Sequence, residues 1–409
     1  MRPSFDRESI FMSLNPAEIL RELVAIPSVN PMGRSDAAPG LGESRLTDYL
    51  ERRLAAFGLY TWRQTVAPGR DNLLARLDGP TPAEQGGGLL LLDAHQDTVP
   101  VEGMTIDPWS PVVREGRLLG RGSCDTKGGM AAMIAAVARL ATERPPGMPS
   151  VLLAFTVDEE YHLMGARTLA SAWREPTAGF PSLPNAALVA EPTGLDVIVA
   201  HKGIIRWHCH AQGRAAHSSQ PELGDNAIYR MARAVTAIQR YAREVLAAGP
   251  ADALCGPATL NAGTIQGGSS INIVPQRCSI ELEIRVPPGE DPQRARGDLI
   301  DYLRGQLTGD PPLQHDAPYM DGPALSDRTN GELAERLASV VRQLRGRCGR
   351  RGVRFATNAA FYASLGIPSV VFGPGAIEQA HTADEWVPLD ELDQAAEIFF
   401  RFLREWRPT

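Results

Sequence analysis

The chain has 409 residues, of which 43% are hydrophobic and 22% are charged, and its formal net charge is -7. This composition indicates a globular protein with two or three domains, and the acidic balance argues against a nucleic-acid partner. The five cysteines are scattered without a CxxC pair, which argues against a disulfide framework or a thiolate zinc site and favours a reducing compartment. The N-terminus lacks a signal-peptide core and no stretch is long enough to span a bilayer, so we expect a cytoplasmic protein with no membrane partner.

From residue 15 to residue 200, helical and strand patterns alternate along the chain. Residues 16–26 and 42–59 carry apolar residues at helical spacing, and "TKGGMAAMIAAVARLATERPPG" predicts a helix that ends at its two prolines. Near-continuous apolar runs predict strands at 72–79, 87–95, 151–160 and 186–192. Such strands are buried on both faces, which predicts a mostly parallel sheet in an α/β domain with helices on each side.

Beyond residue 200 the apolar pattern changes to strict alternation. In "GIIRWHCHAQG" and "CSIELEIRV" every second residue is apolar, which is typical of a sheet with one face in water. A helix at 226–246 is predicted to be amphipathic, with one apolar side formed by Ile228, Met231, Val235, Ile238 and Val245. A second helix of this region is expected to start near Asp291.

The first pattern returns towards the C-terminus. "GIPSVVFGPG" predicts another buried strand, and "DELDQAAEIFFRFLREW" predicts a closing amphipathic helix. We therefore predict one α/β domain made of residues 1–202 and 317–409, interrupted by an inserted α+β domain at residues 203–316 that acts as a lid.

Polar side chains follow the predicted strands of the α/β domain where each strand ends. The carboxyl ends of parallel strands meet at one edge of a sheet, where ligands bind. So many carboxylates and imidazoles in one crevice are costly unless cations neutralise them, and without thiolates they suit zinc, cobalt or manganese. The set is large enough for two ions bridged by one carboxylate. It consists of His95, Asp97, Asp125, Glu159, Glu160, Glu191 and His381.

Each of these signals has a simpler explanation when it is taken alone. A His-x-Asp pair after a strand is commonly a turn, a Glu-Glu pair is commonly a solvated loop, and Asp125 could cap the following helix. Their coincidence at successive strand ends favours metal binding. "DTKGG" does not fit a phosphate loop, "GRGSCD" lacks the third glycine of a dinucleotide fold, and no GxSxG elbow occurs.

Seven segments carry a family resemblance in the same order along nearly the whole chain. The chain resembles the zinc-dependent deacylases and carboxypeptidases that include acetylornithine deacetylase, succinyl-diaminopimelate desuccinylase and aminoacylase. Within that family it is most similar to the acetylornithine deacetylases. The segments are "AHQDTVP", "GRGSCDTKGGMAAM", "TVDEEYHLMGAR", "AEPTGLDVIVAHKG", "GRAAHSSQPELGDNAI", "GGSSINIVPQRC" and "FGPGAIEQAHTADEWV".

The resemblance implies a zinc-peptidase-like catalytic domain with a ferredoxin-like lid and dimerisation domain, and it assigns roles to the polar set. Asp125 would bridge two metals, Asp97 would orient the imidazole of His95, and Glu159 would be the general base. The implied metal ligands are His95, Asp125, Glu160, Glu191 and His381.

In the lid, the resemblance implies a homodimer and three further site residues. His217 would reach the neighbouring subunit's active site and stabilise an oxyanion, although the residue pattern alone equally fits a turn histidine. Asn272 and Arg285 would bind a substrate carboxylate, although Arg285 also fits a solvated sheet face. A half-exposed sheet with a free edge favours the same two-fold association.

Two segments depart from the family pattern. Tyr161, His162 and Leu163 make the loop after Glu160 bulkier than usual, and we interpret His162 as a loop residue and not as a ligand. Asn358 stands near a position where the family usually has an acidic residue, which weakens the case for a substrate with a cationic side chain.

The leading hypothesis is therefore a two-metal amidohydrolase that removes an acyl group from an N-acyl amino acid, similar to acetylornithine deacetylase. The second hypothesis is a desuccinylase or a di- or carboxypeptidase of the same family. The third hypothesis is a binding protein that keeps the fold without catalysis, and the complete polar set argues against it.

Overall fold

The structure is a computed structural model that describes residues 14–34, 40–177 and 179–408. Most of the N-terminal segment considered above for a signal peptide lies outside these residues. By its internal contacts the chain forms two compact units, of which the first contains the chain up to Val199, Asp327–Arg351 and the residues from Thr357 onward. The second contains Ala200–Ser326 and Gly352–Ala356. All five cysteines are free.

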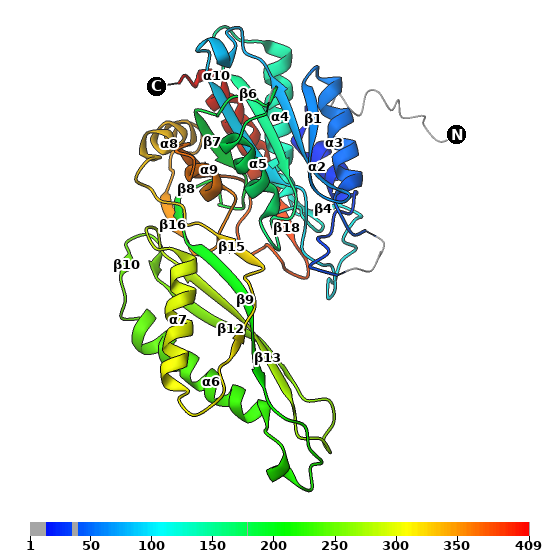
Figure 1. Ribbon diagram of the computed structural model, residues 1–409. Coiled ribbons are helices and arrows are strands. Elements are labelled where there is room, and N and C mark those ends of the chain that lie inside the picture. The colour runs from blue at the N-terminus through cyan, green and yellow to red at the C-terminus, as the bar shows by residue number, and fades with distance from the viewer. Residues whose placement is uncertain (1–13, 35–39, 178, 409) are drawn as a thin grey trace, which may run out of the picture. The chain divides into compact units, whose positions relative to one another are not determined.

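The first unit is built on a mixed sheet whose central strands are parallel (Figure 1). β6, β3, β7 and β17 run parallel, whereas β1, β2 and β8 pair antiparallel with their neighbours. The predicted parallel sheet is thus confirmed for its centre, where the apolar runs are longest. In order across the sheet the strands are β1 (Tyr60–Ala67), β2 (Arg70–Leu77), β6 (Ser150–Thr156), β3 (Leu89–His95), β7 (Ala186–Val189), β17 (Ser369–Val371), β8 (Val197–His201) and β16 (Arg350–Val353).

Helices pack on both faces of this sheet because successive residues of a buried strand point to opposite sides. Leu90 and Leu92 of β3 share a buried cluster with Met133 of α4, while Asp93 points the other way and accepts a hydrogen bond from Tyr362 Oη at 3.0 Å. His95 follows Asp93 by two residues and so shares its side of the strand. The helices are α2 (Pro16–Val24), α3 (Ser44–Ala56), α4 (Lys127–Glu143), α5 (Met164–Arg174), α8 (Gly331–Arg345), α9 (Ala359–Ala363) and α10 (Leu389–Glu405).

A small three-stranded sheet connects distant parts of the first unit. β4 (Val112–Arg114) pairs with β5 (Arg117–Leu119), and β5 pairs with β18 (Trp386–Pro388). This sheet places the C-terminal segment beside the chain that leads into α4. Within the described part of the chain, no helix combines the length and the apolar character needed to cross a bilayer.

The second unit is an antiparallel sheet with two helices against one face (Figure 1). Trp207 and Cys209 alternate inward along β9 as predicted, and they pack in one core with Met231 of α6 and Leu299 of α7. Asp291 caps α7 by accepting from the backbone N–H of Gln293 at 2.9 Å. The elements are β9 (Gly203–Gln212), α6 (Ala227–Tyr241), β12 (Thr259–Gly267), β13 (Arg277–Val286), α7 (Pro292–Gln306), β14 (Gln314–His315) and β15 (Met320–Gly322).

The predicted apolar side of α6 is partly wrong. Met231 and Ile238 are buried, but Ile228 is 36% exposed and Val245 is 44% exposed. Val245 lies beyond α6, in the π-helical segment Ala242–Leu246. The buried stripe is rotated because small residues occupy it, with Ala227, Ala234 and Ala237 beside Met231, Ile238 and Tyr241.

Candidate active site

The residues of the predicted polar set belong to one unit and follow strands that lie side by side. His95 is the last residue of β3, Glu160 lies in the turn after β6, and Glu191 follows β7 by two residues. Asp125 stands two residues before α4, and His381 lies in the segment after β17. Because β6, β3, β7 and β17 are parallel neighbours, their carboxyl ends bring these residues to one edge of the sheet.

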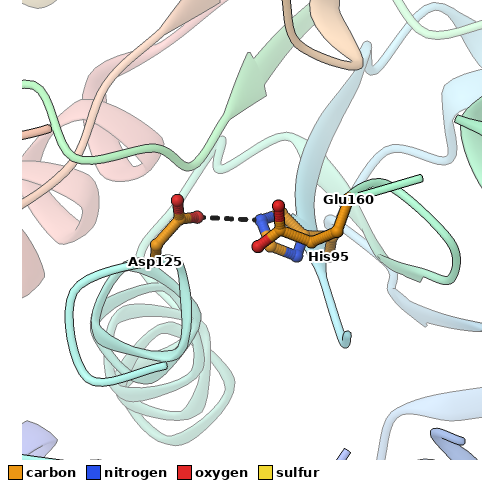
Figure 2. Close-up of side chains that lie close together, drawn as sticks. All are labelled: His95, Asp125 and Glu160. Carbon is orange, nitrogen blue, oxygen red and sulfur yellow. Dashed lines mark hydrogen bonds and ion pairs between the residues drawn. The ribbon is translucent and has the colours of Figure 1, made fainter. Parts of the chain in front are cut away.

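Three of these side chains form a compact group of possible metal ligands. One ligand atom each of His95, Asp125 and Glu160 lies within 4.8 Å of the others, and His95 Nε2 is 3.1 Å from Asp125 Oδ1 (Figure 2). His381 joins the group through Nε2, which lies 3.3 Å from Asp125 Oδ2 and 3.2 Å from Glu160 Oε2. Two carboxylates and two imidazoles thus converge, and this donor set suits zinc and similar divalent ions.

Asp97 is buried and holds the turn that carries Glu159 and Glu160. Its Oδ1 accepts from the backbone N–H of Glu159 at 3.1 Å, and its Oδ2 accepts from that of Glu160 at 3.0 Å. The Nδ1 of His95 lies 2.9 Å from the backbone oxygen of Asp97 and 3.7 Å from its Oδ1. Asp97 therefore positions the histidine and the two glutamates together.

A second buried acid and its partners extend this support, and the sequence analysis did not single them out. Asn30 Nδ2 donates to Asp97 Oδ2 at 2.7 Å and to Asp158 Oδ1 at 3.0 Å. Arg70 donates to the same oxygen of Asp158 at 2.8 Å and also forms an ion pair with Glu43. No periodic or spacing signal marks Asn30, because its partners are 67 and 128 residues away along the chain.

Burial and crowding shift the pKa values of the carboxylates at this edge. Burial raises the pKa values of Glu159, Glu160 and Glu191, and the charge of Asp125 raises them further. Burial opposes protonation of His381, but hydrogen bonds to Asp125 and Glu160 raise its pKa to about 11. Glutamates that resist ionisation beside a histidine that retains its proton indicate an excess of anionic groups at this edge. Divalent cations would relieve that excess, so these residues fit a metal centre.

Other predicted residues of the first unit have different surroundings. His162 lies in the turn after β6 and its Nδ1 is 2.9 Å from Asp158 Oδ2. Asn358 is buried, and its Nδ2 donates to Thr156 Oγ1 at 3.0 Å.

The three predicted site residues of the lid lie in the second unit. His217 is exposed. Its segment pairs with the segment of Asn272, because the backbone N–H of Ser218 donates to the backbone oxygen of Asn272 at 3.0 Å. Arg285 donates to both carboxylate oxygens of Glu283, at 2.7 and 3.1 Å. The structure thus brings His217 and Asn272 together, and it gives the Arg285 guanidinium an internal partner.

A helix-covered sheet with imidazoles and carboxylates gathered at its carboxyl edge can bind divalent metal ions at that edge. The chain matches the model of Peptidase family M20/M25/M40 over residues 91–405, and it belongs to that family. It is therefore a hydrolytic enzyme that acts on amide bonds, in a family of metal-dependent deacetylases and peptidases.

Curated relatives resemble this chain over most of its length. It is 32% identical to an acetylornithine deacetylase of Myxococcus xanthus over 364 residues, which cover 87% of this chain and 90% of that protein. It is 33% identical to an acetylornithine deacetylase of Proteus mirabilis over 399 residues, which cover 95% of this chain and 96% of that protein.

Solved structures share the fold at lower identity. The M20 family metallo-carboxypeptidase Sso-CP2 of Sulfolobus solfataricus has a TM-score of 0.76 at 18% identity, covering 98% of this chain and 99% of its own. A tripeptidase of Staphylococcus aureus has a TM-score of 0.74 at 23% identity, covering 96% of this chain and 98% of its own.

Proposed function

We propose that this chain uses two divalent metal ions to remove an acyl group from an N-acyl amino acid, as the name of its curated relatives describes. The observation that carries this proposal is the position of Asp125. Its Oδ1 lies 3.1 Å from His95 Nε2 and its Oδ2 lies 3.3 Å from His381 Nε2. A carboxylate that presents one oxygen to each of two histidines is suited to bridge two ions. The proposed ligands are His95, Asp125, Glu160, Glu191 and His381.

Bound ions would lower the pKa of a coordinated water and polarise the carbonyl of the scissile amide. Zinc is our first choice, with cobalt or manganese as alternatives, because the donors are imidazoles and carboxylates without thiolates. The free cysteines are consistent with a reducing, cytoplasmic location.

In this proposal Glu159 is the general base. It accepts the proton of the attacking water and delivers it to the leaving amine, so no covalent intermediate with the protein is needed. Its backbone is fixed by the hydrogen bond to Asp97, and burial raises its pKa, which favours uptake of a proton.

The surroundings of Asn358 bear on the preferred substrate. The hydroxyl of Thr156 accepts from Asn358 and donates at 2.9 Å to Oδ1 of Asp93, an acid of β3 that is fully buried. A cationic substrate side chain would find no exposed carboxylate at position 358. We therefore expect N-acetyl amino acids with uncharged side chains to compete well with acetylornithine.

We also propose that two copies associate through the lid, with His217 entering the partner's site and Asn272 and Arg285 binding a substrate carboxylate. Exposed apolar side chains support an association at this place. Ile271 is 99% exposed, Tyr229 is 66% exposed, and both line a hollow of about 700 Å³. β12 forms an edge of the lid sheet and is mostly exposed, which leaves it free to pair with a second copy.

The experiment that tests the proposed function measures free amine released from acetyl, succinyl and dipeptide substrates, with and without a chelator. We expect chelator-sensitive release that is fastest with acetyl substrates. Glu159→Gln should lower kcat by at least about a hundredfold, as expected for loss of a general base. Glu378→Gln makes the same change at an exposed position three residues before His381 and should leave kcat within twofold of wild type. Unchanged turnover in Glu159→Gln would overturn the mechanism.

A further inference from the structure

Glu385 is a buried carboxylate that the mechanism above does not use. Its residue is 1% exposed, and it follows His381 by four residues and immediately precedes β18. Both of its oxygens accept hydrogen bonds from the loop that leads to Asp125. Oε1 accepts from the backbone N–H groups of Cys124 and Asp125, each at 2.9 Å. Oε2 accepts from the backbone N–H of Gly122 and from Arg121, each at 2.8 Å.

These four donors fill the acceptor positions of one carboxylate. Three of them are backbone groups of residues 122–125, so they fix the course of the main chain and not only the position of a side chain. The guanidinium of Arg121 forms an ion pair with Glu385 at 2.8 Å, which offsets part of the cost of burying the carboxylate.

The backbone of Glu385 reinforces the same connection. Its carbonyl accepts from the N–H of Gly120 at 3.0 Å, and the next residue, Trp386, pairs with Leu119 of β5. The segment after His381 is therefore tied to the segment before Asp125 by side chain and by backbone. These two residues face each other across 3.3 Å, from His381 Nε2 to Asp125 Oδ2.

We propose that Glu385 is a positioning residue of the metal centre, which sets the placement of Asp125 relative to His381. This inference rests on the proposed function, because the two residues it aligns are proposed ligands. The Glu385 carboxylate accepts from the backbone N–H of Asp125, and its four hydrogen bonds with the loop do not involve the Asp125 carboxylate. It acts through the backbone of Asp125 and through its short connection to His381.

Glu385→Gln is a sharp test because it keeps the size of the side chain and changes one acceptor into a donor. Whichever way the amide turns, its NH₂ group faces N–H donors of the loop. We titrate the metal-free variant with Co²⁺ by calorimetry. Of the two Co²⁺ ions, we expect the more weakly bound one to bind at least about tenfold less tightly than it does in wild type. At saturating Co²⁺ its visible absorption spectrum should also differ, which a loss of fold stability alone would not produce. Glu397→Gln removes a carboxylate that binds Arg139 and Arg401 on the surface and should leave affinity and spectrum unchanged.

Thermal unfolding of the metal-free proteins shows whether each variant folds. If Glu385→Gln does not fold, Glu385→Asp replaces it in the test. Glu385→Asp keeps the charge, but its side chain is one methylene shorter, so its oxygens lie farther from the N–H donors. We expect the same weaker Co²⁺ binding and the same altered absorption spectrum from this variant. A folded variant with wild-type affinity and a wild-type spectrum overturns the inference. Wild-type protein that fails to bind two Co²⁺ ions would instead overturn the proposed function on which the inference rests.

Discussion

Two histidine–aspartate pairs, His95–Asp97 in the first unit and His210–Asp316 in the second, differ in their surroundings. His95 and Asp97 are buried. Among the residues that the structure describes, the neighbouring acids Asp125 and Glu160 form their ion pairs with histidines. His210 in the second unit lies 2.9 Å from Asp316, whose side chain is 56% exposed. Its other nitrogen contacts Ser279 Oγ at 2.7 Å and Arg277 at 3.3 Å.

The charges near His210 are balanced within the protein, and the Asp316 side chain is exposed. On the same sheet, Glu283 pairs with both Arg206 and Arg285, each at 2.7 Å. The sheet edge near His95 instead has more buried acids than cations, because residues from the ends of several parallel strands meet there. A histidine beside an acid is therefore not by itself a metal site, and the deciding features are burial and an excess of anionic groups.

The largest effect that would sharpen this comparison is expected from Asp97→Asn. The new amide cannot accept from Glu159 N–H, Glu160 N–H and Asn30 at once, so the turn with the general base should shift. We expect kcat to fall about a hundredfold, the upper range for a group that orients metal ligands. Asp316→Asn makes the same change beside His210 and should alter kcat less than twofold. Equal losses in the two variants would break the comparison.

Ile271→Asp tests the second unit as a surface for association. A charge at a fully exposed apolar position that becomes buried between copies should raise the dimer dissociation constant about thirtyfold, or about 2 kcal/mol. Analytical ultracentrifugation over a range of concentrations measures this shift. Exposed Val112 lies in the first unit, and Val112→Asp is the matched control, which should leave the association unchanged. A monomeric wild-type protein would contradict the proposed homodimer.

Asn30→Ala removes the donor shared by Asp97 and Asp158, and it should lower kcat about tenfold. Asn185→Ala is the control, because Asn185 Oδ1 accepts from the N–H of Leu89 at 2.8 Å, at the end of β3 opposite to His95. Both variants should lose about 1–3 kcal/mol of unfolding free energy. Only the first should lose activity, and a similar loss of kcat in Asn185→Ala would contradict a local role for Asn30.

The smallest predicted effect concerns His201, a buried histidine whose pKa is shifted mainly by its burial. Burial lowers the pKa of His201 to about 4, below its ordinary value of 6.5. The unfolded chain therefore binds a proton at pH values where the folded chain does not, so stability falls as the pH falls below 6.5. Between pH 6.5 and 5.5 the loss should be about 1 kcal/mol. Chemical denaturation of wild type and His201→Gln measures it, and an equal slope in both would refute this assignment.

The sequence predicts the polar edge of the first unit because its signals are local. Apolar runs that end at His95 and before Glu160 reveal buried strands, and parallel buried strands must end at a common edge. Asn30 and Glu385 carry no such signal, since each acts through contacts with residues far away along the chain. Their roles depend on the assembled loops and not on any periodic pattern.

The errors in the fold prediction also have physical causes. The sequence does not predict β1, because polar residues such as Arg63 and Gln64 are consecutive there and apolar and polar residues do not alternate strictly along the strand. On α6, Ile228 was assigned to the core because of its hydrophobicity, whereas small alanines allow the helix to approach the sheet on a rotated stripe.

The central claim is that the buried acids at the sheet edge hold two metal ions that are required for hydrolysis. The most direct test adds Zn²⁺ stepwise to metal-free protein while the release of amine from acetylornithine is measured. We predict no turnover without metal and a rate that reaches its plateau at about two ions per chain. Full turnover by protein shown to be free of metal would contradict the claim.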